Sequence, residues 1–204
     1  MTTPATPLSS ARKLTLDDIA DTRAYERERD AFRAHVIEVK RRRRVAVGEI
    51  VTFLFENRDT VRFQVQEMAR VERITTDEGI QTELDVYNPL VPDAGQVCAT
   101  MFIELTSDAA LREWLPRLVG VERSVRLTTA DGGVVEPRLE AQHEAQLTRE
   151  DTTSCVHYLQ WDFTPEQVAA AAQGLTLSVE HANYRASTVL SPETLAELLG
   201  DLRG

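Results

Sequence analysis

Side chains that could hold a metal or form a reactive thiol occur near the end of the sequence. Cys155 and His157 are two residues apart, so on a strand they would share one face, and His181 lies on another predicted strand that could be a neighbour. Such a set could bind a transition metal or activate a thiolate. Because no third or fourth ligand is evident, we favour a half-buried imidazole beside a small, hydrophobic cysteine.

A second metal-ligand spacing lies in the first third of the chain. His35 and Glu38 are three residues apart and would share one face of a helix, and Glu67 on the next predicted helix could add a carboxylate. A two-metal site in a helix bundle needs matching ligands from other helices, and the sequence contains only one such His/Glu pair. We therefore favour solvent-facing charges, predict no cofactor, and keep a metal ion as an alternative.

The third candidate is the basic segment VKRRRRVAVG, residues 39–48, which contains Arg41 to Arg44. Together with Arg58 it could bind an anion or a nucleotide. On a helix, however, four successive side chains spread over about 300°, so they cannot all face one ligand. Cations in a last helical turn also stabilise the exposed carbonyl groups by ~0.3–1 kcal/mol each. We therefore expect the arginines to diverge around the end of a helix that stops near Gly48.

Motifs that would identify an enzyme are missing from the sequence. It contains no G-x-G-x-x-G, no G-x-x-x-x-G-K, no G-x-S-x-G, no H-E-x-x-H and no clustered C-x-x-C. We therefore assign no catalytic residue and lean towards a protein without enzymatic activity.

Composition and charge limit the partners. The chain has 204 residues and a net charge of -10, with 15 Lys and Arg against 12 Asp and Glu up to Thr75, and 8 against 21 beyond it. An acidic surface makes nucleic-acid binding unfavourable. No apolar run approaches the ~18 residues of a membrane span, and the first residues do not resemble a secretory signal. We expect a cytoplasmic protein, with the oligomeric state left open.

The hydrophobic periodicity predicts one α+β domain, residues 13–204, after a flexible tail, residues 1–12. The N-terminal helices pack on a mostly antiparallel sheet of about seven strands, with further helices interspersed. One long helix follows Asp21 or Thr22, and a second begins at a cap formed by Asp59, with Val61, Val65, Met68 and Val71 facing inward. The predicted strands cover residues 50–55, 96–105, 122–128, 134–139, 154–163, 175–181 and 184–191.

Several segments together resemble a known bacterial family. They are VIEVKRRRRVAVGEIVTFLFENRDTVRFQVQEMARVERI (36–74), ELDVYNPLVPDAGQVCATMFIEL, TTSCVHYLQWDF and VEHANYRASTVLSPETLAELLGDL. In these segments the chain resembles domain-of-unknown-function family 3501 over nearly its whole length. The resemblance carries no assigned activity. It implies an accessory or interaction role beside rubrerythrin-like or iron–sulfur redox proteins, and hence an association with oxidative stress.

The resemblance also directs attention to a set of polar residues, whose charges must be paired or hydrated if they are buried. We expect Glu67 and nearby arginines to hold the two long helices against the sheet. A non-enzymatic accessory or interaction protein, which could work with a redox protein as its partner, is the leading interpretation. A small metal- or cofactor-dependent redox enzyme and an anion- or nucleotide-binding protein are the alternatives. The residues of the set are Arg43, Arg44, Glu56, Arg58, Gln64, Gln66, Glu67, Arg70, His157, His181 and Tyr184.

Overall fold

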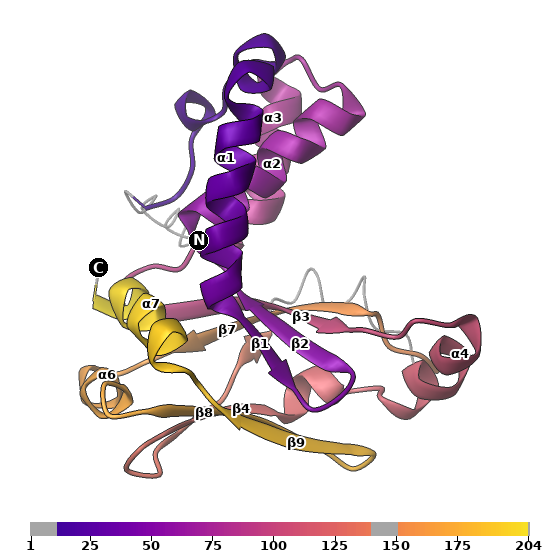
Figure 1. Cartoon of the computed structure of the whole chain (residues 1–204), viewed down its shortest axis with the longest axis vertical. Helices are drawn as coiled ribbons and strands as arrows, with labels where there is room; N and C mark the ends of the chain where they lie inside the picture. The colour runs from indigo at the N-terminus through magenta and orange to yellow at the C-terminus, as the bar shows by residue number, and fades with distance from the viewer. Residues whose placement is uncertain (1–11, 140–150, 204) are drawn as a thin grey trace, which may run out of the picture.

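The protein consists of a body of two sheets and a helical arm that projects from it (Figure 1). The long helices of the arm are α1 (Thr22–Arg43), α2 (Arg58–Glu72) and α3 (Asp77–Tyr87). The computed structural model describes residues 12–139 and 151–203, so the predicted tail lies outside the described residues except for Arg12, which donates to the main-chain oxygen of Asp201 at 2.8 Å. The predicted α+β class is confirmed. The helices are η1 (Leu16–Asp18), α1 (Thr22–Arg43), α2 (Arg58–Glu72), α3 (Asp77–Tyr87), η2 (Asn88–Leu90), α4 (Asp108–Arg117), η3 (Val121–Ser124), α6 (Pro165–Ala171) and α7 (Pro192–Arg203).

The strands form two antiparallel sheets rather than the single sheet of about seven strands that the sequence predicted. One has the order β1-β2-β3-β7-β6 and the other the order β5-β4-β8-β9. The predicted strand over 134–139 accounts for part of the difference, because it is divided in two: β5 pairs with β4, whereas β6, after Pro137, pairs with β7 in the other sheet. The strands are β1 (Arg44–Val47), β2 (Val51–Phe55), β3 (Gln96–Ile103), β4 (Val125–Thr129), β5 (Val134–Val135), β6 (Arg138–Leu139), β7 (Val156–Asp162), β8 (Leu175–His181) and β9 (Tyr184–Val189).

The main hydrophobic core lies between the two sheets. Alternate residues of each strand point inward, so that Phe53 and Trp161 from the five-stranded sheet pack in one cluster with Leu127 and Leu177 from the four-stranded sheet. All four side chains are fully buried. Burial of this apolar surface is the main stabilising contribution to the body of the protein.

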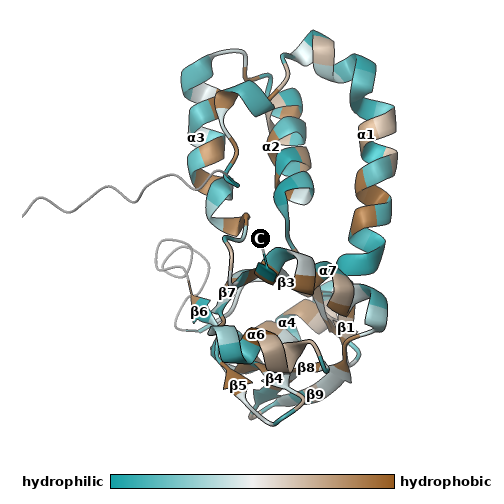
Figure 2. Cartoon of the chain, turned by 90° about the vertical axis from the view of Figure 1, so that its left-hand side faces the viewer, coloured by the Kyte–Doolittle hydropathy of each residue, from teal (hydrophilic) through white to brown (hydrophobic). Residues whose placement is uncertain are grey.

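The opposite face of the five-stranded sheet is turned towards the helical arm. A smaller hydrophobic cluster on this side joins Val61 and Val65 of α2 to Leu84 of α3 and Leu90 of η2, and Tyr158 of β7 packs against it. In Figure 2 the three arm helices stand side by side above the sheets. No described helix is long and apolar enough to cross a membrane.

The two long helices of the arm begin close to where the sequence predicted. Asp21 caps α1, as expected, but Asn57 rather than Asp59 caps α2 by accepting from the amide of Thr60 at 3.0 Å. The inner face of α2 also differs, because Val71 is 65% exposed whereas Gln66 is buried. Gln66 exchanges two hydrogen bonds with the main chain of Ala20, which compensates for the burial of its amide.

Gly48 does not end α1, as the sequence had suggested, but forms the turn between β1 and β2. Its φ of +75° favours glycine, and a Cβ at this position would lie 2.3 Å from the hydroxyl oxygen of Tyr184. That hydroxyl donates to the main-chain oxygen of Val47 at 2.6 Å, and Thr188 donates to Ala46 at 2.8 Å. Tyr184, one of the candidate polar residues, therefore joins the edge strands β1 and β9 of the two sheets.

Arg43, the last residue of α1, attaches the arm to the body. Its side chain is 3% exposed and donates to Glu197 at 3.0 Å and to Asp201 at 2.7 Å, both on α7. Burial raises the pKa of Asp201 despite this arginine. Burial would also raise the pKa of Glu197, but its bonds to Arg42 and Arg43 bring that pKa below the usual value. Figure 1 shows α7 at the foot of α1, where this contact forms.

The other three arginines of the run diverge, as predicted. Arg41 donates to Glu38 on its own helix at 3.2 Å. Arg42 donates to Glu197 at 2.7 Å. Arg44 begins β1 and pairs with Glu104. The run is thus divided among five acidic residues, of which Glu197 is shared by Arg42 and Arg43, and it serves the fold. The five are Glu38, Glu104, Glu193, Glu197 and Asp201.

We predict that R43M lowers the free energy of unfolding by ~3–5 kcal/mol, because it leaves the carboxylates of Glu197 and Asp201 without their buried partner. R41M is the matched control two residues away, since the Arg41 side chain is 59% exposed; its cost should stay under ~1 kcal/mol. Urea unfolding followed by circular dichroism measures both. Equal effects of the two substitutions would contradict the anchoring role of Arg43.

Candidate functional site

The metal-ligand candidates on the arm are engaged in separate pairs. His35 of α1 contacts Asp59 of α2 with 2.8 Å between Nε2 and Oδ2, and Glu38 accepts from Arg41. Glu67 faces a different set of partners. Within residues 12–139 and 151–203, no group of three or more His, Cys, Asp or Glu side chains is placed to hold a metal ion.

The candidates near the end of the chain do not converge either. His157 is on β7 and His181 on β8, and these strands belong to different sheets, so the expectation that they are neighbours was wrong. Nε2 of His157 lies 3.0 Å from both the main-chain oxygen of Ser154 and the hydroxyl of Thr153. His157 is thus a buried imidazole held by local partners, and burial lowers its pKa although Glu122 opposes the shift.

His181 and Cys155 occupy positions of their own. Nε2 of His181 is 3.2 Å from the main-chain oxygen of Val119, a contact that ties β8 to the segment after α4. Cys155 precedes β7 and is half-buried, rather than lying within the strand as the sequence suggested. Among the residues that the structure describes, His157, His181 and Cys155 therefore do not form a set of metal ligands.

Glu67 is the centre of a network that joins α1 to α2. Its carboxylate accepts from Tyr25 at 2.7 Å, from Arg29 at 2.8 and 3.0 Å, and from Arg70 at 3.1 Å. The hydrogen bond from Arg29 is the main reason that the pKa of Glu67 falls to about 2, against the effect of burial. The expected network exists, but it holds the two helices to each other; the contact with the body is made by Arg43.

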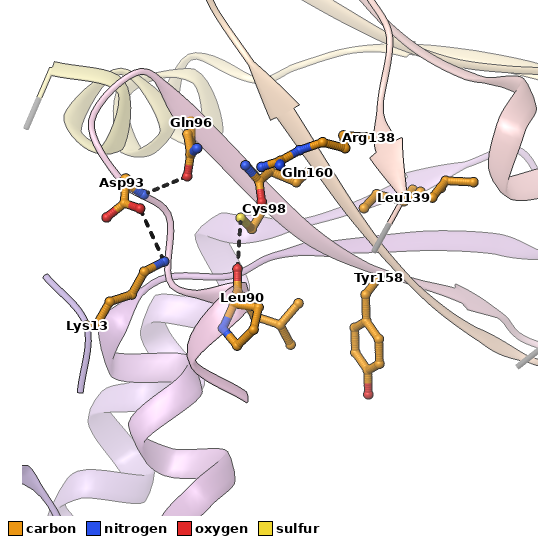
Figure 3. Close-up of a pocket in the computed structure, with 11 residues that line it drawn as sticks. Lys13, Leu90, Asp93, Gln96, Cys98, Arg138, Leu139, Tyr158 and Gln160 are labelled. Carbon is orange, nitrogen blue, oxygen red and sulfur yellow. Dashed lines mark hydrogen bonds and ion pairs between the residues drawn. The ribbon is translucent and has the colours of Figure 1, made fainter. Parts of the chain in front are cut away.

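A cleft lies between the arm and the face of the five-stranded sheet that is turned towards it. Its larger part has a volume of about 460 Å³ and is lined by η2, β3, β6 and β7. Figure 3 shows Lys13 and Asp93 on one side of it and Arg138 and Gln160 on another, with Cys98 between them. The polar groups surround an apolar wall that includes Leu90, Leu139 and Leu159.

The charges of this larger cavity are partly compensated. Lys13 donates to the main-chain oxygen of Val91 and lies 3.5 Å from Asp93. Arg138 is 64% exposed and lies 3.3 Å from Asp162. Two cations and one carboxylate, that of Asp93, therefore line the space.

Cys98 is on the wall of the larger cavity but is a poor nucleophile. Its side chain is buried and its thiol contacts the main-chain oxygen of Pro89 at 3.7 Å. Burial raises the pKa of the thiol to about 12, so it stays protonated at neutral pH. Cys98 is thus a buried residue of the wall, and it faces the arm rather than the space between the sheets.

A second cavity of about 220 Å³ adjoins the first, and both are lined by Leu90 and Tyr158. In Figure 3 the Tyr158 side chain extends from β7 towards the helical side of the sheet. The smaller cavity is also lined by Gln64 of α2 and by Glu56, which follows β2. Two of the candidate polar residues therefore meet in this cleft.

Glu56 is the buried charge of the site. Its side chain accepts from the hydroxyl of Thr60 at 2.5 Å and from the hydroxyl of Thr100 at 2.6 Å. Sequence reasoning selected Glu56 and Gln64 but missed Thr60, Thr100 and Tyr158. For Thr100 and Tyr158 the available signal was the polar alternation on one face of the predicted strands over 96–105 and 154–163.

The remaining arginine candidates are structural contacts of the arm. Arg58 donates to Asp18 of η1 at 2.5 Å, and Arg70 donates to Glu67. Neither lines the cleft.

These features define an α+β protein with a two-sheet body, a helical arm and a cleft at their junction. The chain belongs to the DUF3501 family: the family described as "Protein of unknown function (DUF3501)" matches residues 13–202. The resemblance found in the sequence is thereby confirmed. No curated protein matches the chain significantly.

A solved structure of similar fold covers almost the whole chain. It is a "novel protein of unknown function" from Burkholderia pseudomallei K96243, with 34% sequence identity and a TM-score of 0.85. The match spans 93% of this chain and 99% of the other. The arrangement of sheets and arm is therefore similar in a protein that is 34% identical in sequence.

We predict that E67Q weakens the acid dependence of stability. A carboxylate with a lowered folded pKa stabilises the protein above its unfolded pKa of about 4.5, and this stability is lost as pH falls from there to about 2. Urea midpoints measured across that range should fall more for the wild type than for E67Q. The matched control is E26Q on α1, whose side chain is 52% exposed; it should follow the wild type, and identical slopes for all three proteins would contradict the assignment.

Proposed function

We propose that the protein is a non-enzymatic accessory protein that binds a small, partly apolar molecule in the cleft between the arm and the five-stranded sheet. The observation that carries the proposal is the pair of adjoining cavities, about 460 and 220 Å³, that meet at Leu90 and Tyr158. Small-molecule sites are concave, lie at the junctions of structural units, and combine apolar walls with a few polar groups. The cleft has each of these properties.

The chemistry of the cleft supports binding rather than reaction. His157 is on the face of β7 opposite to Tyr158, which keeps its imidazole away from the cavities. The Cys98 thiol is protonated, and no strongly nucleophilic group accompanies it among the described lining residues. The polar groups that remain can orient a ligand by hydrogen bonds and charge.

The other interpretations of the sequence have less support. The arginine run is divided among internal carboxylates, which removes the main motivation for a nucleotide site there. The scattered histidines offer no ligand set for a metal-dependent redox enzyme within the described chain. A rubrerythrin-like or iron–sulfur partner, and a cytoplasmic location, are supported by the sequence and the family resemblance alone.

We predict that compounds with a six-carbon chain bind in the cleft, and we choose hexanol, hexylamine and hexanoate as probes that differ in head group. A ligand at ten times its Kd adds about 1.4 kcal/mol to the stability, which raises Tm by about 4 °C for a chain of this length. Thermal unfolding and ligand-observed NMR measure the binding. The proposal fails if none of the three binds up to its solubility limit.

Two substitutions test in which cavity the ligand binds. Q160W fills the larger cavity and Q64W the smaller one, because both side chains are half-buried on the walls. The matched control is Q173W, an exposed glutamine after α6 that lines neither cavity. Binding should weaken in Q160W, Q64W or both and persist in Q173W. Unchanged binding in both cavity variants would show that the probes bind elsewhere and would contradict the proposal.

A further inference from the structure

Glu56 is a buried carboxylate at the wall of a cavity. The residue is 8% exposed and lines the smaller cavity of about 220 Å³. Its two oxygens accept one hydroxyl each, from Thr100 and Thr60. A carboxylate has about four acceptor positions, so roughly half of its capacity for hydrogen bonds is left after these two.

The charge of Glu56 is not paired by a cationic side chain in the described part of the chain. Within residues 12–139 and 151–203, no Lys, Arg or His nitrogen lies within 4.0 Å of its carboxylate. Arg43 reaches only the main-chain oxygen of Glu56, at 3.4 Å, and its charge is matched by Glu197 and Asp201. Burying a charged group is costly unless it is paired, so a cation that binds beside this carboxylate would be stabilising.

Glu56 lies beside the N-terminus of α2. It immediately precedes Asn57, the N-cap of α2, and the positive end of a helix favours a negative charge. Lys40 also lines the cavity, but its Nζ lies over the ring of Phe63, 5.6 Å from the centroid, and makes no recorded ion pair with Glu56. The cavity is therefore able to accept one further cation next to the carboxylate.

The rest of the cavity wall suits an organic cation. Tyr87, Phe102 and Tyr158 contribute aromatic rings, and Leu54 and Leu90 contribute aliphatic surface. Aromatic faces attract ammonium groups, and this attraction strengthens when water is excluded. A metal ion would require several oxygen ligands at short distance, whereas the described wall offers one carboxylate among rings and hydroxyls.

We propose that Glu56, oriented by Thr60 and Thr100, is the recognition site for a protonated amine on the ligand of the cleft. The inference rests on the proposed function and names the chemical class of the ligand: an alkyl or aralkyl amine. The ammonium group donates to Glu56 in the smaller cavity, and the apolar remainder passes Leu90 and Tyr158 towards the larger cavity. Thr60 and Thr100 act as positioning residues, because they hold the carboxylate by its other acceptor positions.

The test compares hexylamine, hexanol and hexanoate on the full chain. We expect the wild-type protein to bind hexylamine about tenfold or more tightly than hexanol, because a hydrogen bond between charged groups is added, and to bind hexanoate most weakly. E56Q should lose that preference for the amine while retaining hexanol binding. The control E49Q removes an exposed carboxylate in the β1–β2 turn and should keep the wild-type order.

The outcomes separate the inference from the proposed function. Binding of hexanol or hexanoate with no preference for hexylamine overturns the assignment of Glu56 and leaves the cleft as a ligand site. Equal hexylamine affinity in the wild type and E56Q also overturns it. The wild-type order alone decides the question if E56Q does not fold, and failure of all three compounds to bind removes the proposed function itself.

Discussion

The buried contact of Arg43 with Glu197 and Asp201 fixes how the two parts of the protein are arranged. Arg43 is the last residue of α1 and Arg44 is the first of β1, so the arm passes into the sheet without a linker. A guanidinium group can bind two carboxylates in a defined geometry. Because both acids are on α7, the contact sets the direction in which α1 leaves the sheet, and with it the positions of α2 and α3.

The cleft is a consequence of that arrangement. Helices that lay flat on the five-stranded sheet would fill its second face with side chains, as the other sheet does on the first face. Here α2 and α3 contact this face through a small cluster that includes Leu90 and Tyr158, and space remains on either side of those residues. Several polar residues on the wall are partnered by other groups of the protein, such as Glu56 by Thr60 and Thr100 and Lys13 by Asp93, as buried polar groups require.

Much of the fold could be predicted from local patterns, whereas the site could not. The helical spacing of Tyr25, Val36 and Val39 marks the buried face of α1, and residues 156–161 alternate between half-buried and buried positions along β7. These signals depend on neighbours in the chain. The division of the strands into two sheets depends on which distant strands pair, and the two-residue strands β5 and β6 carry too little sequence pattern to reveal it.

The candidate site shows the same limit. Glu56 and Gln64 could be selected as polar residues next to apolar segments, but Thr100 and Tyr158 come from strands that are distant in the sequence, Thr100 being 36 positions beyond Gln64. Their meeting requires the pairing of β3 with β7, where Thr100 is opposite Tyr158. The histidine and cysteine cluster, which the sequence offered as the less favoured interpretation, does not form for the same reason: strand spacing does not reveal which sheet each strand joins.

The contact between Tyr184, Thr188 and the carbonyl groups of Val47 and Ala46 has a consequence for association between molecules. β1 and β9 are terminal strands of their sheets, and open main-chain groups on such strands can recruit a strand from another copy and begin aggregation. Two hydroxyl groups occupy those carbonyl groups on β1 instead. At the β1–β9 edge two main-chain acceptors are thus covered by side chains of the same molecule, a form of protection that does not depend on surface charge or on salt concentration.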